Sequence, residues 1–160
     1  MEIENGNINY KIGSEIGKGV FGRVFKVGMR LKIGDNFTNN REVAMKVIKK
    51  ASLNDVTCAN LRQEVHVLKT VQSPNIISLI DVFEDEDFVY IITEFCNGGD
   101  LSRVLDLNNR LTKKKLIQRI LVQVIKGLKA LHEQGVIHRD VKAPNILLHF
   151  PNSKQKDIRF

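Results

Sequence analysis

Apolar and polar residues alternate through much of the first half of the chain, a period of two that is typical of half-buried β-strands. Two such stretches, Tyr10–Gly19 and Arg23–Lys32, flank a glycine-containing turn and predict a hairpin. The polar segment Gly34–Asn40 is predicted as a turn, and Val43–Ile48 as a third short strand. Three adjacent antiparallel strands are therefore expected first.

The hydrophobic period becomes helical in the next segment, Asn54–Gln72. Apolar residues recur there every three or four positions, at Leu61, Val65, Leu68 and Val71. Asn54 or Asp55 is suited to cap this helix, and Pro74 stops it. Two more strands, Ile76–Phe83 and Phe88–Thr93, then complete five strands and one helix.

The second half of the chain is mainly helical in its pattern. Asp100 is suited to cap a short helix through Leu105, and a long helix is predicted from Thr112 to a stop at Gly135. One apolar stripe runs along the long helix through Leu116, Ile120, Val124, Leu128 and Leu131. A further strand is predicted to begin near Asp157.

The composition agrees with a folded domain, since 42% of the 160 residues are hydrophobic and 27% are charged. No apolar run approaches the roughly 18 residues that a membrane span needs. Glu2 and Glu4 stand where a secretory signal would carry basic and apolar residues. A cytoplasmic location is therefore expected, and Cys58 and Cys96 are expected to be free thiols and not zinc ligands.

The formal net charge of +7 fits phosphate ligands, nucleic acid or general solubility, and does not choose among them. The lysine runs at 49–50 and 113–115 have no aromatic residues interleaved for base stacking. We therefore interpret them as solvated faces and expect no nucleic-acid partner.

Gly17, Gly19 and Gly22 form a G-x-G-x-x-G string. By itself the string fits a tight hairpin turn and a functional loop equally well. A dinucleotide fold would continue into a helix, whereas Val24 and Val27 continue a strand here. A glycine hairpin lying over phosphates is the better functional interpretation.

Lys46 lies in the apolar strand Val43–Ile48, where an isolated lysine is most simply an exposed edge residue. Glu64, however, falls on the apolar stripe of the predicted helix, and a carboxylate there needs a cationic partner. Pairing Lys46 with Glu64 would satisfy both groups and aim an ammonium at phosphate oxygens.

The segment His138–Asn145 follows the long helix and is open to two interpretations, a polar turn or a catalytic loop. The density of functional side chains favours the second. Asp140 is able to accept a proton from a hydroxyl, and Lys142 to neutralise a transferring phosphoryl group. Asn145 offers a carbonyl oxygen, the kind of ligand that Mg²⁺ prefers.

Taken together, the chain resembles the front part of a eukaryotic protein kinase domain of the serine/threonine class. Gly17–Val24 resembles the glycine-rich loop, Val43–Lys46 the lysine strand, Glu64 its helix partner, and His138–Asn145 the catalytic loop. Lys142, two residues after the expected base, is the feature that resembles the serine/threonine class.

The resemblance implies roles for single residues. Lys46, Glu64, Asp140 and Lys142 would be catalytic, and Asn145 would bind Mg²⁺. Nucleotide-binding positions implied by the resemblance are Ile16, Gly17, Lys18, Gly19, Val20, Phe21, Gly22, Arg23, Val24, Ala44, Lys46, Thr93, Glu94, Cys96, Asp100 and Leu147.

Within that set the resemblance distinguishes several functions. Thr93 would lie at the back of the adenine pocket, and the main chain of Glu94 and Cys96 would hydrogen-bond the base. Asp100 would reach the ribose.

The fold implied is α+β, with a five-stranded antiparallel sheet and one helix followed by the beginning of a helical second lobe. The first lobe is expected at about residues 10–93, a hinge at 94–99, and a partial second lobe at 100–160. The string Asp-Phe-Gly, which carries the family's main Mg²⁺ ligand, does not occur in the sequence. We therefore expect a fragment of a longer kinase that is inactive alone.

The function implied is ATP-dependent phosphoryl transfer to serine or threonine of protein substrates, with ATP and Mg²⁺ as cofactors. A partner kinase or regulatory protein is a further possible partner. An alternative remains open, a pseudokinase-like module that binds nucleotide or a partner without catalysis.

Overall fold

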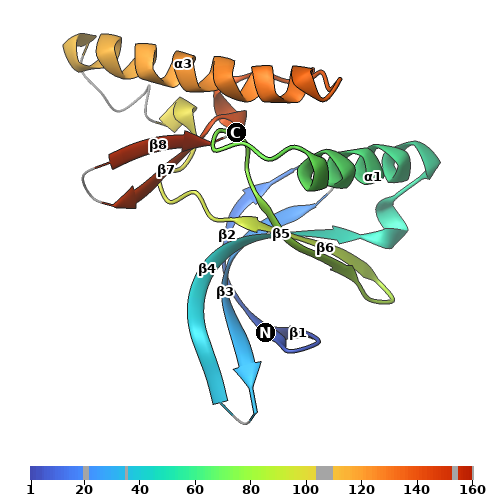
Figure 1. Cartoon of the computed structure of the whole chain (residues 1–160). Coiled ribbons are helices and arrows are strands. Elements are labelled where there is room, and N and C mark those ends of the chain that lie inside the picture. Colours follow the sequence, from blue (N-terminus) through green and yellow to red (C-terminus); the bar gives the residue numbers. More distant parts are fainter. Residues whose placement is uncertain (20–21, 35, 104–109, 153–154, 160) are drawn as a thin grey trace. The chain divides into compact units, whose positions relative to one another are not determined.

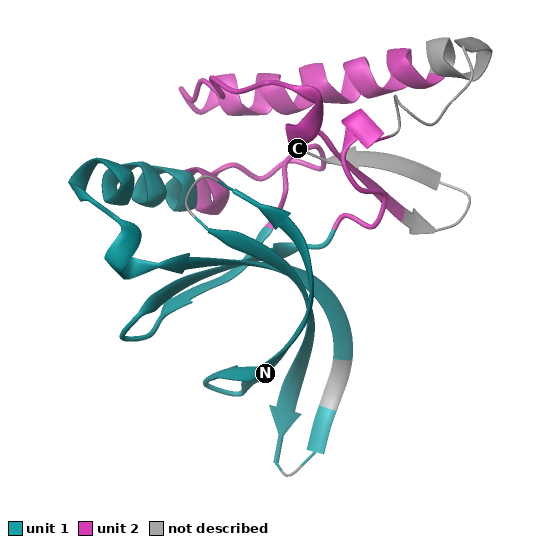
Figure 2. Cartoon of the chain, turned by 180° about the vertical axis from the view of Figure 1, so that it is seen from behind, with its two compact units in different colours: residues 1–66, 79–95 teal, residues 67–78, 96–160 magenta. Residues whose placement is uncertain are grey.

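The computed structural model describes residues 1–19, 22–34, 36–103, 110–152 and 155–159. They form two compact units, residues 1–66 with 79–95, and residues 67–78 with 96–160 (Figure 2). The strands are β1 (Glu2–Asn5), β2 (Ile8–Lys18), β3 (Arg23–Ile33), β4 (Asn36–Lys49), β5 (Leu79–Glu84), β6 (Phe88–Glu94), β7 (Leu147–Asn152) and β8 (Gln155–Arg159). The helices are α1 (Asp55–Thr70) and α3 (Arg110–Glu133), with 3₁₀ turns η1 (Lys50–Ser52) and η2 (Ala143–Asn145).

The first unit contains an antiparallel sheet with strand order β1-β2-β3-β4-β6-β5 (Figure 1). The prediction of five strands is therefore corrected to six, because β1 pairs with β2 ahead of the first predicted strand. A turn at Gly6 and Asn7 joins the two strands, and Gly6 has a φ of 57°, which glycine adopts readily. The acidic, four-residue β1 carries only a weak strand pattern. The turn at Gly6 and Asn7 is therefore the main feature of the sequence that indicates this hairpin.

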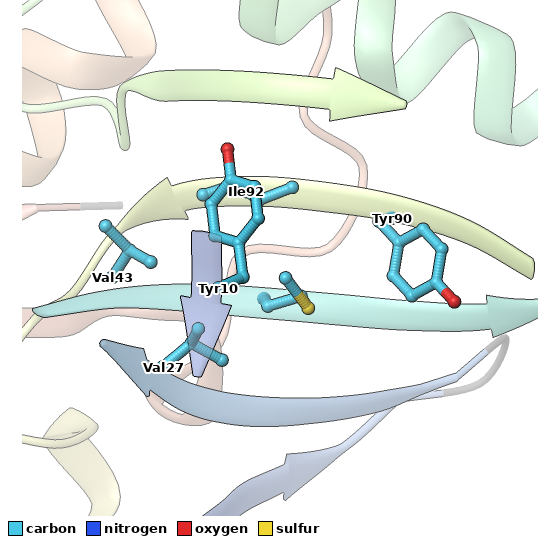
Figure 3. Packing of buried hydrophobic residues seen from close by; sticks show 6 residues of the cluster. Tyr10, Val27, Val43, Tyr90 and Ile92 are labelled. Atoms are coloured by element: carbon cyan, nitrogen blue, oxygen red, sulfur yellow. The ribbon is translucent and has the colours of Figure 1, made fainter. Parts of the chain in front are cut away.

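Alternate residues of the central strands point to opposite faces of this sheet. One face buries the core of the first unit, which Figure 3 shows, and its fully enclosed members are Tyr10, Val27, Val43, Met45, Tyr90 and Ile92. In β4 the core residues are 43 and 45, so Ala44 and Lys46 face the other way. The period of two read from the sequence therefore places Ala44 and Lys46 on the face opposite this core, together with the buried Ile48 and Ile91.

Asp81 on β5 ties together strands from the two ends of the sheet order. Its Oδ2 atom accepts hydrogen bonds from Asn5 Nδ2 on β1 at 2.9 Å and from the Tyr10 hydroxyl on β2 at 2.8 Å. Phe83 stacks between Tyr10 and Tyr90, with ring centroids 5.5 and 4.8 Å apart. The sheet is therefore curled so strongly that its two edge strands, β1 and β5, exchange a side-chain contact.

Two local predictions in the first unit need correction. The polar segment predicted as a turn is mostly strand, because Asn36 and Phe37 begin β4 and pair with Ile33 and Lys32. The first strand after Pro74 begins at Leu79 and not at Ile76.

Helix α1 begins as predicted. Asn54 Oδ1 accepts from the Thr57 amide at 2.9 Å, and Thr57 Oγ1 accepts from the Asn54 amide at 2.8 Å. This reciprocal cap satisfies two main-chain donors at the helix start.

The second unit is built around α3, whose predicted apolar stripe is buried. Ile120, Val124 and Leu131 are at most 5% exposed. The helix begins at Arg110, two residues earlier than predicted. At its other end, Gly135 has a φ of 70° and the Val136 amide donates to the Leu131 carbonyl at 3.0 Å, which is a Schellman stop. Among the described residues, no helix is long and apolar enough to cross a membrane.

Residues 97–101, a turn followed by the first helical residue, make hydrogen bonds with β7 and with Ile146 before it in the same unit. Asn97 makes two hydrogen bonds with the main chain of Phe150, one to its carbonyl at 3.0 Å and one from its amide at 2.8 Å. The Gly98 amide donates to the Leu148 carbonyl at 2.8 Å. Residues 101–103 are helical as predicted, whereas Leu105 lies outside the described residues.

Candidate active site

The glycine string lies at the hairpin between β2 and β3. The Gly19 amide donates to the Gly22 carbonyl at 2.8 Å and closes the turn, while Val20 and Phe21 lie outside the described residues. Gly17 and Lys18 end β2 and pair with Val24 and Arg23. The hairpin expected from the sequence therefore forms, with its glycines at the turn.

Gly22 has a packing reason to be glycine that is separate from any ligand. A Cβ atom at this position would overlap the carbonyl oxygen of Val47 on β4 and lie 3.0 Å from Ile48 Cγ1. The hairpin therefore approaches β4 closely, which holds the end of the loop near the strand that carries Lys46.

The Arg23 side chain is already engaged. Its Nε donates to Glu15 Oε2 at 2.9 Å, and its guanidinium lies 5.4 Å from the centre of the Phe25 ring. The hydrogen bond from Arg23 lowers the pKa of Glu15 below its ordinary value and raises the pKa of Arg23. The sequence places two cations at the hairpin, Lys18 and Arg23. Arg23 would have to break its contact with Glu15 before its side chain could bind a phosphate.

Lys46 and Glu64 form the predicted ion pair. Lys46 Nζ lies 2.7 Å from Glu64 Oε1 and 2.9 Å from Oε2, so both carboxylate oxygens accept from the ammonium. The side chains are 22% and 40% exposed respectively. Glu64 is therefore less buried than its place on the apolar stripe predicted, and the pair retains access to solvent.

The strand register places several predicted nucleotide-binding residues on the same face as Lys46. Val24 on β3 is paired with Lys46, and Ala44 is paired with Thr93 on β6. Because cross-strand partners share a face, these four side chains lie opposite the buried core of the first unit. Ile16, at the end of β2, is 38% exposed. The face offers small or apolar contacts beside one ammonium.

Glu94 and Cys96 lie on either side of the passage from the first unit to the second. Glu94 ends β6 opposite Val43, and Cys96 is 8% exposed. These positions stay predictions as main-chain contacts for a base.

Asp100 uses its carboxylate locally. It accepts from the Ser102 hydroxyl, from the Arg103 amide at 3.2 Å, and pairs with Arg103 Nε at 3.1 Å. The Ser102 hydrogen bond is the main cause that lowers the pKa of Asp100. Leu147 is bridged to Asp100 at the start of β7. A ribose contact by Asp100 would therefore compete with Ser102 and Arg103.

The second unit brings three predicted catalytic-loop residues together. Asp140 Oδ2 accepts from Lys142 Nζ at 2.9 Å and from Asn145 Nδ2 at 2.8 Å. The Lys142 hydrogen bond, followed by that of Asn145, lowers the pKa of Asp140. Asp140 is thus ionised at neutral pH, and its side chain is 60% exposed, so its second oxygen is accessible for a hydroxyl.

The main chain holds this loop in a compact form. The Asp140 amide donates to the His138 carbonyl at 2.9 Å, and the Asn145 amide donates to the Lys142 carbonyl at 2.9 Å. Arg139 has a φ of 63°, a conformation that side chains other than glycine adopt rarely. The positive φ of Arg139 and the 3₁₀ turn η2 therefore fix the spacing of Asp140 and Asn145.

These residues supply only part of a Mg²⁺ site. Asn145 commits its amide nitrogen to Asp140, which leaves the amide oxygen as the atom suited to a hard cation. Within the described ranges, no group of three or more His, Cys, Asp or Glu side chains is placed to hold a metal. Asp140 and Asn145 by themselves therefore do not complete a Mg²⁺ site, and further ligands would have to come from phosphates, water or other residues.

Sequence reasoning missed two polar contacts around these sites. Glu15, which holds Arg23, and Asn97, which holds the main chain of Phe150, had no predicted role. The Glu15 contact spans the hairpin and could have been read from its cross-strand position. The Asn97 contact joins residues 53 apart and left no local signal.

The fold and these two clusters define a class of protein. Residues 10–159 match the protein kinase domain family, and the chain belongs to that family. The resemblance inferred from four motifs is thereby confirmed.

Two relatives make the class more specific. The chain is 38% identical to serine/threonine-protein kinase ULK3 of Xenopus laevis over 156 residues, which is 95% of this chain and 32% of that protein. It is 35% identical to probable serine/threonine-protein kinase 2 of Plasmodium falciparum (isolate K1 / Thailand) over 146 residues, 89% of this chain and 26% of that protein. The family is thus that of serine/threonine protein kinases, and the chain spans about a quarter to a third of the length of these curated relatives.

Proposed function

We propose that this chain supplies the nucleotide-binding and hydroxyl-activating residues of an ATP-dependent serine/threonine protein kinase. The observation that carries the proposal is the Lys46–Glu64 pair, in which both oxygens of one carboxylate hold one ammonium. Val24 and Ala44 share that sheet face with Lys46. The two apolar side chains would contact the base of a nucleotide, and the ammonium of Lys46 would contact its phosphates.

In this proposal Glu64 fixes the orientation of Lys46, and Lys46 contacts the α and β phosphates. The main chain of the glycine hairpin at Gly19 and Gly22 covers the phosphates, since glycine permits a close approach of the backbone. Thr93 lies at the back of the adenine pocket, and the main chain of Glu94 and Cys96 hydrogen-bonds the base. These assignments rest on the family resemblance and on the shared sheet face.

The transfer step uses the second cluster. Asp140 accepts the proton of a serine or threonine hydroxyl while that oxygen forms a bond to the γ phosphorus. The bond between the γ phosphorus and the bridging oxygen breaks, and ADP leaves. Lys142 offsets the negative charge that develops on the transferred group. Asn145 would hold Mg²⁺ through its amide oxygen, and the ion would offset the negative charge of the phosphates.

We also infer that these 160 residues bind nucleotide without efficient catalysis on their own. The support is the incomplete metal site among the described residues together with the absence of Asp-Phe-Gly from the sequence. The alternative of a pseudokinase-like binding module rests on the same observation. Robust Mg²⁺-dependent phosphorylation of a protein substrate by the purified chain, abolished in Asp140→Asn, would contradict both.

The partners follow from the proposed chemistry, namely a nucleotide and a protein substrate with serine or threonine. A partner kinase or a regulatory protein is the further partner that the pseudokinase-like alternative would bind. The cytoplasmic setting expected from the sequence belongs to this proposal.

Nucleotide binding is tested by the thermal shift that ATP produces. We expect ATP to raise the melting temperature of the wild-type chain, and Lys46→Met to abolish the rise. Lys50→Met is the matched control, since Lys50 also pairs with one glutamate, Glu84, at 3.2 Å. Equal shifts in Lys46→Met and wild type would refute the assignment of Lys46.

A further inference from the structure

The far end of the β3–β4 hairpin forms a ribbon of two strands. The last pair between β2 and β3 joins Ile8 to Leu31, and the pairs between β4 and β6 begin only at Val43. Within the described residues, the Lys32 amide still donates to the Asn7 carbonyl at 2.7 Å, and the Ile33–Asn36 pair beyond it joins β3 and β4 only to each other. Figure 1 shows these ends of β3 and β4 projecting together.

The ribbon ends in exposed apolar side chains. Ile33 is 59% exposed and Phe37 is 47% exposed, while Leu31 nearer the sheet is 39% exposed. Neither Ile33 nor Phe37 belongs to the core cluster of the first unit. Burial within this unit therefore does not account for either side chain.

The register places these two side chains on opposite faces of the ribbon. Ile33 is paired with Asn36, and Phe37 is paired with Lys32. Because cross-strand partners share a face and neighbouring residues alternate, Ile33 and Phe37 point in opposite directions. A flat protein surface would cover only one of them, whereas a medium that surrounds the end of the ribbon covers both.

Basic residues lie beside the apolar end, at Lys32, and farther along the ribbon, at Arg30 and Arg41. The segment from residue 30 to 41 contains Arg30, Lys32 and Arg41 against one acidic residue, Asp35, which lies outside the described part of the chain. Lys32 and Arg41 are exposed. The next acidic residue along β4, Glu42, is already paired with Lys26 at 2.6 Å.

Apolar side chains at an exposed end, backed by cations, have the arrangement that an anionic lipid surface requires. Apolar groups enter the boundary between headgroups and acyl chains, and cations pair with the lipid phosphates. We propose that the end of the β3–β4 hairpin, defined by Ile33 and Phe37 with Lys32 and Arg41, docks onto anionic phospholipid. The interaction is independent of the nucleotide chemistry proposed above.

Vesicle co-sedimentation of the purified chain tests this docking. We expect binding to vesicles that contain one-third phosphatidylserine, and weaker binding to pure phosphatidylcholine or at high salt. The double variant Ile33→Ser with Phe37→Ser should lose roughly tenfold in affinity, as should Lys32→Gln with Arg41→Gln. Val56→Ser is the matched control, because Val56 on α1 is an apolar residue with 69% exposure, and it should bind as wild type does.

Each result of the vesicle experiment either supports or overturns docking on anionic lipid. Equal vesicle binding by wild type and by the Ile33 and Phe37 double variant would overturn the proposal, as would wild-type binding that does not depend on phosphatidylserine. Preference for an acidic polypeptide such as polyglutamate over the vesicles would assign the hairpin to a protein partner instead. The Lys32 and Arg41 variant changes exposed residues only, so it tests the charge even if the apolar variant melts at a lower temperature.

Discussion

Raising the pH is a direct probe of the core of the first unit, because its two tyrosines are the only ones in the chain. Tyr10 is fully buried and donates its hydroxyl to Asp81, and Tyr90 is 3% exposed and donates to Asp85 at 2.6 Å. Burial, followed by the hydrogen bond to the carboxylate, raises the pKa of Tyr10 well above 10 and that of Tyr90 to about 12.

The sign of the effect follows from the two states. In the unfolded chain a tyrosine releases its proton near pH 10, whereas in the folded chain it keeps it to a higher pH. The folded state is therefore fully favoured by these groups below pH 10 and loses that advantage as the pH rises above 10. At pH 11 each tyrosine would lower the free energy of unfolding by about 1.4 kcal/mol, or about 3 kcal/mol for both. That is a large part of the 5–15 kcal/mol typical of a domain.

Tyrosinate absorbance measured beside far-ultraviolet circular dichroism tests this prediction. The chain contains no tryptophan, so the absorbance change reports these two residues alone. We expect tyrosinate to appear together with the loss of secondary structure. Tyr10→Phe should remove about half of the alkaline loss of stability, relative to its own stability at pH 8. A titration with a midpoint near pH 10 in the folded chain would show that the reasoning about both phenols is wrong.

Three further predictions concern single contacts. Glu64→Gln keeps the size of the side chain but removes the charge that holds its lysine, so ATP affinity should fall by about tenfold in calorimetry while the melting temperature changes little. Gly22→Ala adds a Cβ against the Val47 carbonyl and should lower the free energy of unfolding, measured by urea denaturation, by about 1–3 kcal/mol. Gly34→Ala is the control, because a Cβ there has no atom within 4 Å and adds only the strain of a positive φ. Asn97→Ala removes both hydrogen bonds to the main chain of Phe150 and should speed hydrogen exchange at the Phe150 amide, and unchanged exchange would contradict the role of this side chain.

The sequence predicted the features that have a local or periodic cause. Lys46 and Glu64 could be matched because one interrupts an apolar strand and the other an apolar helix stripe, and each needs the other's charge. The α3 stripe and its stop at Gly135 were predicted from helical spacing and from the conformational freedom of glycine.

The features that depend on remote pairing were missed. Strand β1 is too short and acidic to be recognised without β2, and the asparagine-rich start of β4 reads as a turn until β3 is present to pair with it. Glu64 is more exposed than predicted. The helical period shows which face of the helix a residue is on, but it does not show which other residues cover that face.

The tie at Asp81 has a consequence for the order of folding. It joins Asp81 to Asn5 and Tyr10, which are 76 and 71 residues away in the sequence, so we expect it to form after the intervening strands have assembled. A contact that is absent from the folding transition state affects the unfolding rate and leaves the folding rate nearly unchanged. We therefore expect the Asp81 contact to lengthen the lifetime of the native state more than it speeds folding.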